Sequence, residues 1–258
     1  MKSLSPLSSA CLGLLILAST VSSCKKADNS EKEKSGFGKI SYVAKASNSG
    51  RKNLSSIGNG TQVSSTIDTL TQVDVTWSFA TVYVDKISFK GVNNSLLDTT
   101  ITVEKNLDLF NSNSLAGVVT LPSGSYQDVA VKMLCRKSLI PGIATNYFAF
   151  HFKGTFVNVN GGIDSVLVGS SNPFEASLSV PEIVIGASGN YVATFNFDLN
   201  KVLKGINRQQ LQTAPSFFRN GHTTYSIFKG GSADVPFYNQ VVENWQNLAN
   251  VTITENVL

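Results

Sequence analysis

The chain of 258 residues carries 21 Lys and Arg against 17 Asp and Glu, a formal net charge of +4, and only 15% of its residues are charged. The basic residues do not cluster with aromatic side chains, so the sequence predicts no nucleic-acid partner. Ser, Thr, Asn and Gly are abundant, which is typical of extracellular β-proteins.

The first 23 residues have the pattern of a secretory signal, in which residues 11–18 (CLGLLILA) form a short apolar run after Lys2. This run is too short for a bilayer, which needs about 20 apolar residues. The signal ends at residues 21–24 (VSSC), which resemble the bacterial lipobox. The resemblance implies cleavage between Ser23 and Cys24, and acyl chains on Cys24 that anchor the protein in a membrane. The alternative is an ordinary signal peptide with a chance cysteine near its end.

The residues after Cys24 begin with Lys25 and continue with acidic residues. This order is similar to the surface-export tether of Bacteroidota lipoproteins, and the alternative is a solvated charged linker. We therefore expect a lipid-anchored protein of the outer membrane, on the cell surface if the tether is an export signal and facing the periplasm if it is a plain linker. Residues 24–66 are predicted to be a tether and loop with one candidate strand at 40–44, and residues 67–258 to be the β domain.

The cysteines have separate fates in this prediction, since Cys11 leaves with the signal and Cys24 carries lipid. Cys135 then stands alone, so no disulfide forms within the mature chain. It follows Met133 in phase on a predicted strand, and we interpret it as a small buried hydrophobic residue rather than a reactive thiol.

The stretch 115–135 gives the clearest local pattern, because two β-rich runs flank a Pro-Ser-Gly-Ser sequence. Pro122 presets a turn φ angle and Gly124 tolerates positive φ, which together predict a β-hairpin. Val129, Val131 and Met133 alternate with more polar residues and are expected on the core face.

The longest strand signal is residues 73–89, in which the apolar phase changes near Phe79 and so predicts a bulge or bend. Residues 147–159 and 163–168 flank Asn160-Gly161-Gly162, which predicts a hairpin rather than a calcium loop, because the bidentate carboxylate of such a loop is missing. Further strands are predicted at 99–103, 174–180, 182–185, 191–197 and 251–257.

Helices are few. Leu199, Val202 and Leu203 form one apolar turn that ends at Gly205, and apolar residues at helical spacing from 238 to 249 predict an amphipathic helix around Trp245. The pattern as a whole predicts a mainly β fold: an antiparallel β-sandwich, prealbumin-like or immunoglobulin-like, with a C-terminal amphipathic helix.

Three stretches in order carry a resemblance: 77–89 (a Trp-led strand, WxxAxVxVxxIxF), 107–134 (an apolar-Asp-apolar segment followed by LPSGSY) and 192–203 (a strand ending in FDLN). Together they resemble an uncharacterised domain family of Bacteroidota lipoproteins with a prealbumin-like sandwich. The resemblance covers residues 72–205 and implies the fold and the cellular localisation, but no activity.

No catalytic or metal-binding motif stands in the sequence, and its two histidines, His151 and His222, have no ligand spacing between them. We expect no catalytic residue, no cofactor and no metal. Exposed polar and aromatic residues in 209–225 predict instead a ligand-binding surface, for a glycan or an envelope protein. The residues assigned to it are Phe217, Phe218, Arg219 and Tyr225.

The leading functional hypothesis is a non-enzymatic lipoprotein of the outer membrane or cell surface that binds an envelope or extracellular ligand. One alternative is a fimbrial subunit that assembles by strand exchange, since Bacteroidota pilins are also lipoprotein-made sandwiches whose tether is cut after an Arg, as Arg51 would allow. A second alternative is a carbohydrate-active hydrolase, which needs two carboxylates about 5–10 Å apart.

Overall fold

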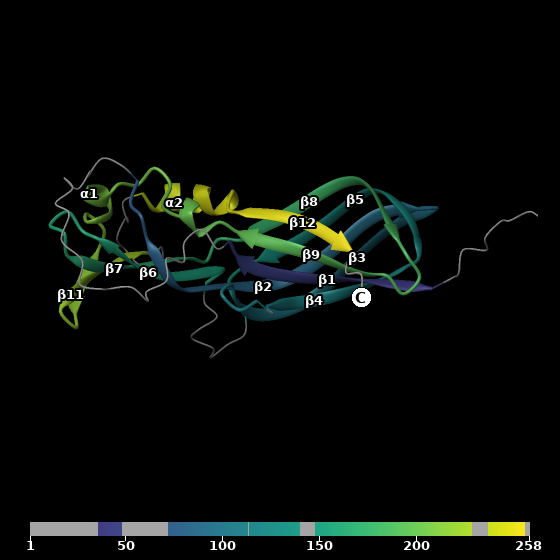
Figure 1. Cartoon of the computed structure of the whole chain (residues 1–258), viewed down its shortest axis with the longest axis horizontal. Helices are drawn as coiled ribbons and strands as arrows, with labels where there is room; N and C mark the ends of the chain where they lie inside the picture. The colour runs from purple at the N-terminus through teal and green to yellow at the C-terminus, as the bar shows by residue number, and fades with distance from the viewer. Residues whose placement is uncertain (1–35, 48–71, 113, 140–147, 229–236, 256–258) are drawn as a thin grey trace, which may run out of the picture. The chain divides into compact units, whose positions relative to one another are not determined.

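The computed structural model describes residues 36–47, 72–112, 114–139, 148–228 and 237–255 (Figure 1). These residues belong to one compact unit, Lys34–Leu258, which is mainly β. The predicted signal peptide, Cys24 and Arg51 lie outside the described residues. No helix among the described residues is long and apolar enough to cross a membrane.

The first sheet has four strands in the order β12-β9-β1-β4. Alternating apolar residues point into the protein, and on β1 Ile40, Tyr42 and Ala44 are fully buried. The strand β1 runs antiparallel to β4 on one side and parallel to β9 on the other. The bounds are β1 Phe37–Ala46, β4 Leu115–Pro122, β9 Asn190–Phe197 and β12 Ala249–Glu255.

The second sheet has eight strands, and β2 is its central member. One edge of β2 pairs with β3. The opposite edge pairs with β6 along its first part and with β5 along its second, so β5 and β6 follow one another along that edge. The bounds are β2 Thr76–Asn93, β3 Ser95–Asp108, β5 Gly124–Cys135, β6 Phe150–Val157, β7 Ile163–Ser170, β8 Phe174–Ile185, β10 Ser216–Arg219 and β11 His222–Ile227.

The register of β2 shifts between Trp77 and Phe79, which confirms the bulge predicted near Phe79. A second shift lies between Val84 and Lys86. This bulge lies between the part of β2 that pairs with β6 and most of the part that pairs with β5. A third shift, between Lys90 and Val92, lies within the part that pairs with β5.

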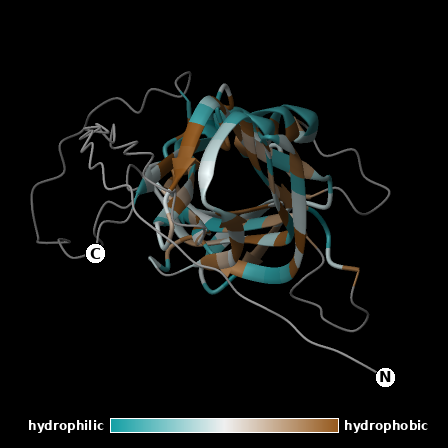
Figure 2. Cartoon of the chain, turned by 90° about the vertical axis from the view of Figure 1, so that its right-hand side faces the viewer, coloured by the Kyte–Doolittle hydropathy of each residue, from teal (hydrophilic) through white to brown (hydrophobic). Residues whose placement is uncertain are grey.

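One hydrophobic core collects buried side chains from both sheets. Val129, Val131 and Met133 of β5 belong to it, as predicted, and Cys135 is fully buried beside them. Burial raises the pKa of the Cys135 thiol, which keeps it protonated. Figure 2 shows polar and apolar residues alternating along the strands, as expected when one face of each strand packs inward.

Three short helical segments complete the unit: η3 Leu199–Lys201, α1 Arg208–Leu211 and α2 Tyr238–Gln246. Asp198 caps η3 by accepting the Asn200 N–H at 3.2 Å, and Gly205 ends the following turn with a φ of +76°. On α2, Asn244 donates to the carbonyls of Val202 and Lys204 at 3.1 and 2.9 Å, which ties the helix to this turn.

Trp245 anchors α2 on the core with 1% of its surface exposed. Its ring contacts four aromatic side chains from both sheets, with centroids 4.1 to 5.7 Å apart. The four side chains are Phe150, Phe152, Phe174 and Phe197.

Two sequence-based predictions are wrong. The runs on either side of Ser123 do not form a hairpin, because β4 pairs with β1 in the first sheet and β5 with β2 and β8 in the second. Ser123 is a corner between sheets, closed by the Tyr126 hydroxyl donating to the carbonyl of Pro122 at 2.8 Å. The sheets are also not wholly antiparallel, since β1–β9 and β7–β11 are parallel pairs. Local patterns reveal the buried face of a strand, but these partners lie far apart in sequence.

The predicted domain boundary also changes. The candidate strand at 40–44 is present as part of β1, between β9 and β4. The folded unit therefore includes residues before 67, where the sequence placed the start of the β domain. The hairpin around Gly161 is confirmed: β6 and β7 pair antiparallel, and Asn158 Oδ1 accepts the Asn160 and Gly162 N–H groups at 3.0 and 2.9 Å.

Candidate functional site

The four residues assigned to ligand binding lie on one hairpin, β10–β11. A two-residue turn joins its strands, and Asn220 and Gly221 both have positive φ, 53° and 83°. Phe217 and Phe218 on β10 are 47% and 75% exposed, and Arg219 beside them is also exposed. Since neighbouring residues of a strand face opposite sides, the two Phe rings do not form one flat platform.

Tyr225 does not belong to that surface. It is only 7% exposed, its ring packs against Phe156 at 5.8 Å, and its hydroxyl lies 3.4 Å from the Gln212 amide nitrogen that donates to it. Asp164 braces the hairpin from β7, since its carboxylate accepts the Thr223 N–H at 3.0 Å. The structure thus exposes three of the four predicted residues and buries the fourth.

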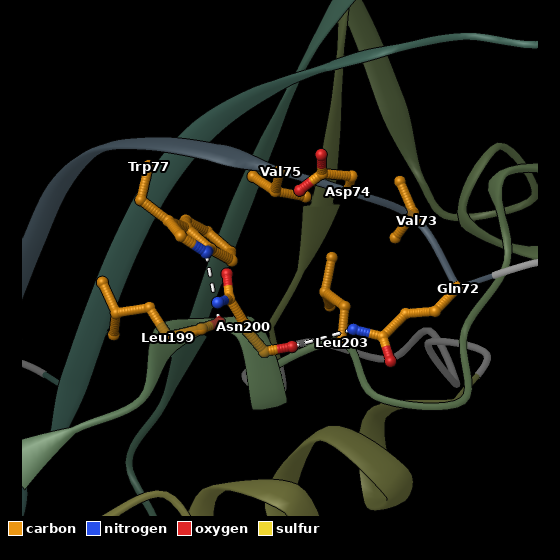
Figure 3. A pocket seen from close by; sticks show the side chains of 8 residues that line it. All are labelled: Gln72, Val73, Asp74, Val75, Trp77, Leu199, Asn200 and Leu203. Atoms are coloured by element: carbon orange, nitrogen blue, oxygen red, sulfur yellow. Dashed lines mark hydrogen bonds between the residues drawn. The ribbon is translucent and has the colours of Figure 1, made fainter. Parts of the chain in front are cut away.

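A hollow of about 240 Å³ lies between the start of β2 and the turn that contains η3 (Figure 3). Apolar side chains from both segments line it together with three polar residues at its rim. The lining residues are Gln72, Val73, Asp74, Val75, Trp77, Leu199, Asn200 and Leu203.

Hydrogen bonds hold the two walls of this hollow in place. Trp77 Nε1 donates to the carbonyl of Leu199 at 3.1 Å, and Gln72 Nε2 donates to the carbonyl of Asn200 at 2.8 Å. Val73 N–H reaches the carbonyl of Ile206 at 2.9 Å. These three hydrogen bonds join the start of β2 and the segment before it to the turn that contains η3.

The floor of the hollow depends on a close approach to β6. Trp77 pairs with Gly154, and a Cβ added at Gly154 would lie 2.5 Å from Val75 Cγ1 and 2.8 Å from the carbonyl of Thr76. Only glycine leaves room for the strand carrying Val75 and Trp77 to lie this close. Gly154 thereby lets β6 lie close to Val75 and Trp77, two residues that line the hollow.

The rim of the hollow offers groups that bind polar ligands. Asp74 is exposed, and none of the ion pairs among the described residues engages its carboxylate. Figure 3 shows the Asn200 amide beside the Trp77 indole, with Asp74 on the β2 side of the hollow. A carboxylate accepts hydrogen bonds and an amide both donates and accepts, so the rim matches a hydroxyl-bearing or amine-bearing ligand.

His151 is part of an aromatic cluster rather than of the hollow. His151 lies among Phe79, Phe148 and Phe228, with ring centroids 5.3 to 5.9 Å away. Burial, and then the charge of Lys153, lower the pKa of His151, so the ring stays neutral. Among the described residues, no group of three or more His, Cys, Asp or Glu is placed to hold a metal ion.

A partly exposed ion pair joins Arg136 to Asp85 at the second bulge of β2, with an Nη2–Oδ1 distance of 2.8 Å. Asp85 is 2% exposed, so Arg136 supplies the charge that permits a carboxylate there. The pair fixes the end of β5 against β2, and its role is structural.

No protein-family model, no curated protein and no solved structure matches the chain. The site must be interpreted from its own geometry. Sequence reasoning missed the hairpin form of residues 216–227, although Asn220-Gly221 is a strong signal for a two-residue turn. It also missed the hollow, because residues 72–77 and 199–203 meet only through the tertiary fold.

Proposed function

We propose that the protein is a lipid-anchored lipoprotein of the outer membrane or cell surface that binds an envelope or extracellular ligand without changing it chemically. Its anchor is the lipid expected on Cys24. We further propose a prealbumin-like sandwich, in which β12-β9-β1-β4 faces β8, β5, the second part of β2 and β3. This arrangement is compatible with the resemblance to the Bacteroidota lipoprotein domain family.

The hollow beside Trp77 is the observation that supports the binding function best. Its volume of about 240 Å³ suits a single sugar ring or a similarly small group. Small-ligand sites combine an apolar lining with a few fixed polar groups, and here Val73, Val75 and Leu203 provide the lining while Asp74 and Asn200 provide the polar groups. We propose a glycan end as the ligand, bound through its hydroxyl groups.

An array of glycans and envelope proteins tests this function when it is paired with a broad hydrolase screen. We expect binding without turnover, and a loss of about 10-fold or more in affinity for Asp74→Ala, since a hydrogen bond to a charged group contributes about 1.5–3 kcal/mol. Asp98→Ala is the matched control, because it removes an exposed carboxylate on β3 outside the lining of the hollow. Turnover that disappears when one carboxylate is replaced would establish a hydrolase instead.

A second candidate function is a structural subunit that assembles by strand exchange, and the position of β1 favours it. The strand lies inside the sheet between β9 and β4, and Arg51 follows it in the sequence. Cleavage after Arg51 would detach β1 from the rest of the chain. Its loss would open a groove beside buried core residues, where a strand of another subunit can pair.

Limited digestion with a protease that cuts only after Arg, followed by size-exclusion chromatography, tests this alternative, because trypsin would also cut after the neighbouring Lys52. A strand-exchange subunit would lose β1 and assemble into multimers, and Arg51→Ala would prevent both events. An Arg51→Ala variant whose assembly equals that of the unmutated protein excludes this route.

A further inference from the structure

No strand among the described residues pairs with the outer edge of β10. All four residues of β10 are exposed, and β10 is the last strand at its end of the eight-stranded sheet. Its four residues include no Pro and no register shift, which are two of the features that protect an edge strand from pairing with another chain, and its one charged residue, Arg219, is its last.

The hairpin register determines which backbone groups face outward. Pro215 and Ser226 form a hydrogen-bonded pair, since Ser226 N–H donates to the carbonyl of Pro215 at 2.8 Å. In an antiparallel ladder hydrogen-bonded and non-hydrogen-bonded pairs alternate. Phe217 therefore bonds inward to Thr224, and the N–H and C=O groups of Ser216 and Phe218 point away from β11.

This spacing is self-complementary. We propose that β10 pairs antiparallel with β10 of a second copy of this chain, about a two-fold axis through Phe217. Ser216 of each copy then forms a hydrogen-bonded pair with Phe218 of the other, and the two Phe217 side chains meet at the centre. Both outward donors and both outward acceptors of each strand are satisfied.

The side chains fit the same register. The exposed Phe217 becomes covered by its symmetry mate, which removes apolar surface from water. Arg219 lies opposite Pro215 of the other copy, so the two Arg219 charges stand at opposite ends of the pairing and do not repel each other closely. The inference concerns the edge of the hairpin and does not depend on the hollow.

Disulfide trapping tests the register. In a mature chain, residues 24–258, with Cys24→Ala, Cys135 is the only native thiol left, and it is buried. Two Phe217→Cys thiols would face each other across a non-hydrogen-bonded pair, at a Cα separation of about 4.5 Å that a disulfide can bridge. Phe218→Cys is the matched control, since diagonal neighbours stand about 7–8 Å apart.

We expect at least about tenfold more disulfide-linked dimer from Phe217→Cys than from Phe218→Cys, although Phe218 is the more exposed residue. Adding Ser216→Pro to Phe217→Cys removes one N–H that would bond to the second copy, and it leaves the hydrogen bonds between β10 and β11 intact. This double variant should form no disulfide-linked dimer, whereas Ser216→Thr combined with Phe217→Cys should still form it. Three results would overturn the proposal: equal amounts of linked dimer from the two Cys variants, an amount of dimer that Ser216→Pro leaves unchanged, or no linked dimer at all. Each of these results leaves ligand binding at Asp74 to be decided separately by the array.

Discussion

Replacing Trp245 by Ala should unfold the protein at a much lower temperature. The ring is 1% exposed and contacts four Phe rings from both sheets, so its removal leaves a large cavity where α2 meets the core. Truncation of a buried Trp costs about 3–5 kcal/mol, which for a unit of this size lowers Tm by about 6–20 °C.

Trp245→Phe sharpens this prediction. The buried Nε1 of Trp245 finds no hydrogen-bond partner among the described residues. Phe removes that unpartnered N–H, which costs about 1–3 kcal/mol when buried, and keeps a ring among the aromatic contacts. We therefore expect Trp245→Phe to lose much less stability than Trp245→Ala.

Differential scanning calorimetry measures both variants, with Phe218→Ala as a control that removes a ring exposed to 75%. The control should change stability by less than about 0.5 kcal/mol. If Trp245→Ala melts at the same temperature as the control, the helix does not depend on this ring. If Trp245→Phe and Trp245→Ala have the same melting temperature, their loss of stability does not come from the cavity that Ala leaves.

Three further predictions follow. Metabolic labelling with a palmitate analogue should tag the protein through Cys24, and labelling that persists in Cys24→Ala would refute the lipobox. The pKa of His151 is lowered in the folded protein, so as pH falls below about 6.5 the unfolded state binds a proton more readily than the folded state, and the free energy of unfolding should decline. Urea titrations at several pH values should show a smaller decline for His151→Phe. An equal dependence of the unfolding free energy on pH in the two proteins would contradict this prediction. A chain starting at residue 67 lacks β1 and should show no cooperative melting transition, whereas a chain starting at Lys34 should melt normally.

The sequence predicted best what is local. The bulge near Phe79, the β6–β7 hairpin, the buried face of β5 and the strand β9 all follow from alternation and turn residues within short windows. The parallel pairing of β1 with β9 joins residues about 150 positions apart, and no local pattern specifies it. The rim residues Asp74 and Asn200 looked like ordinary polar positions, because their meeting depends on that long-range topology.

The most direct measurement of the binding function uses Trp77 as a reporter. The chain has two Trp residues, so Trp245→Phe leaves Trp77 as the single indole, and this indole lines the hollow. Titrating this variant with a glycan that binds on the array should give a saturable change in fluorescence, and adding Asp74→Ala should weaken it about 10-fold or more. Binding in the hollow would be contradicted if a glycan binds with the same affinity to Trp245→Phe and to the double variant with Asp74→Ala, and leaves the Trp77 emission unchanged.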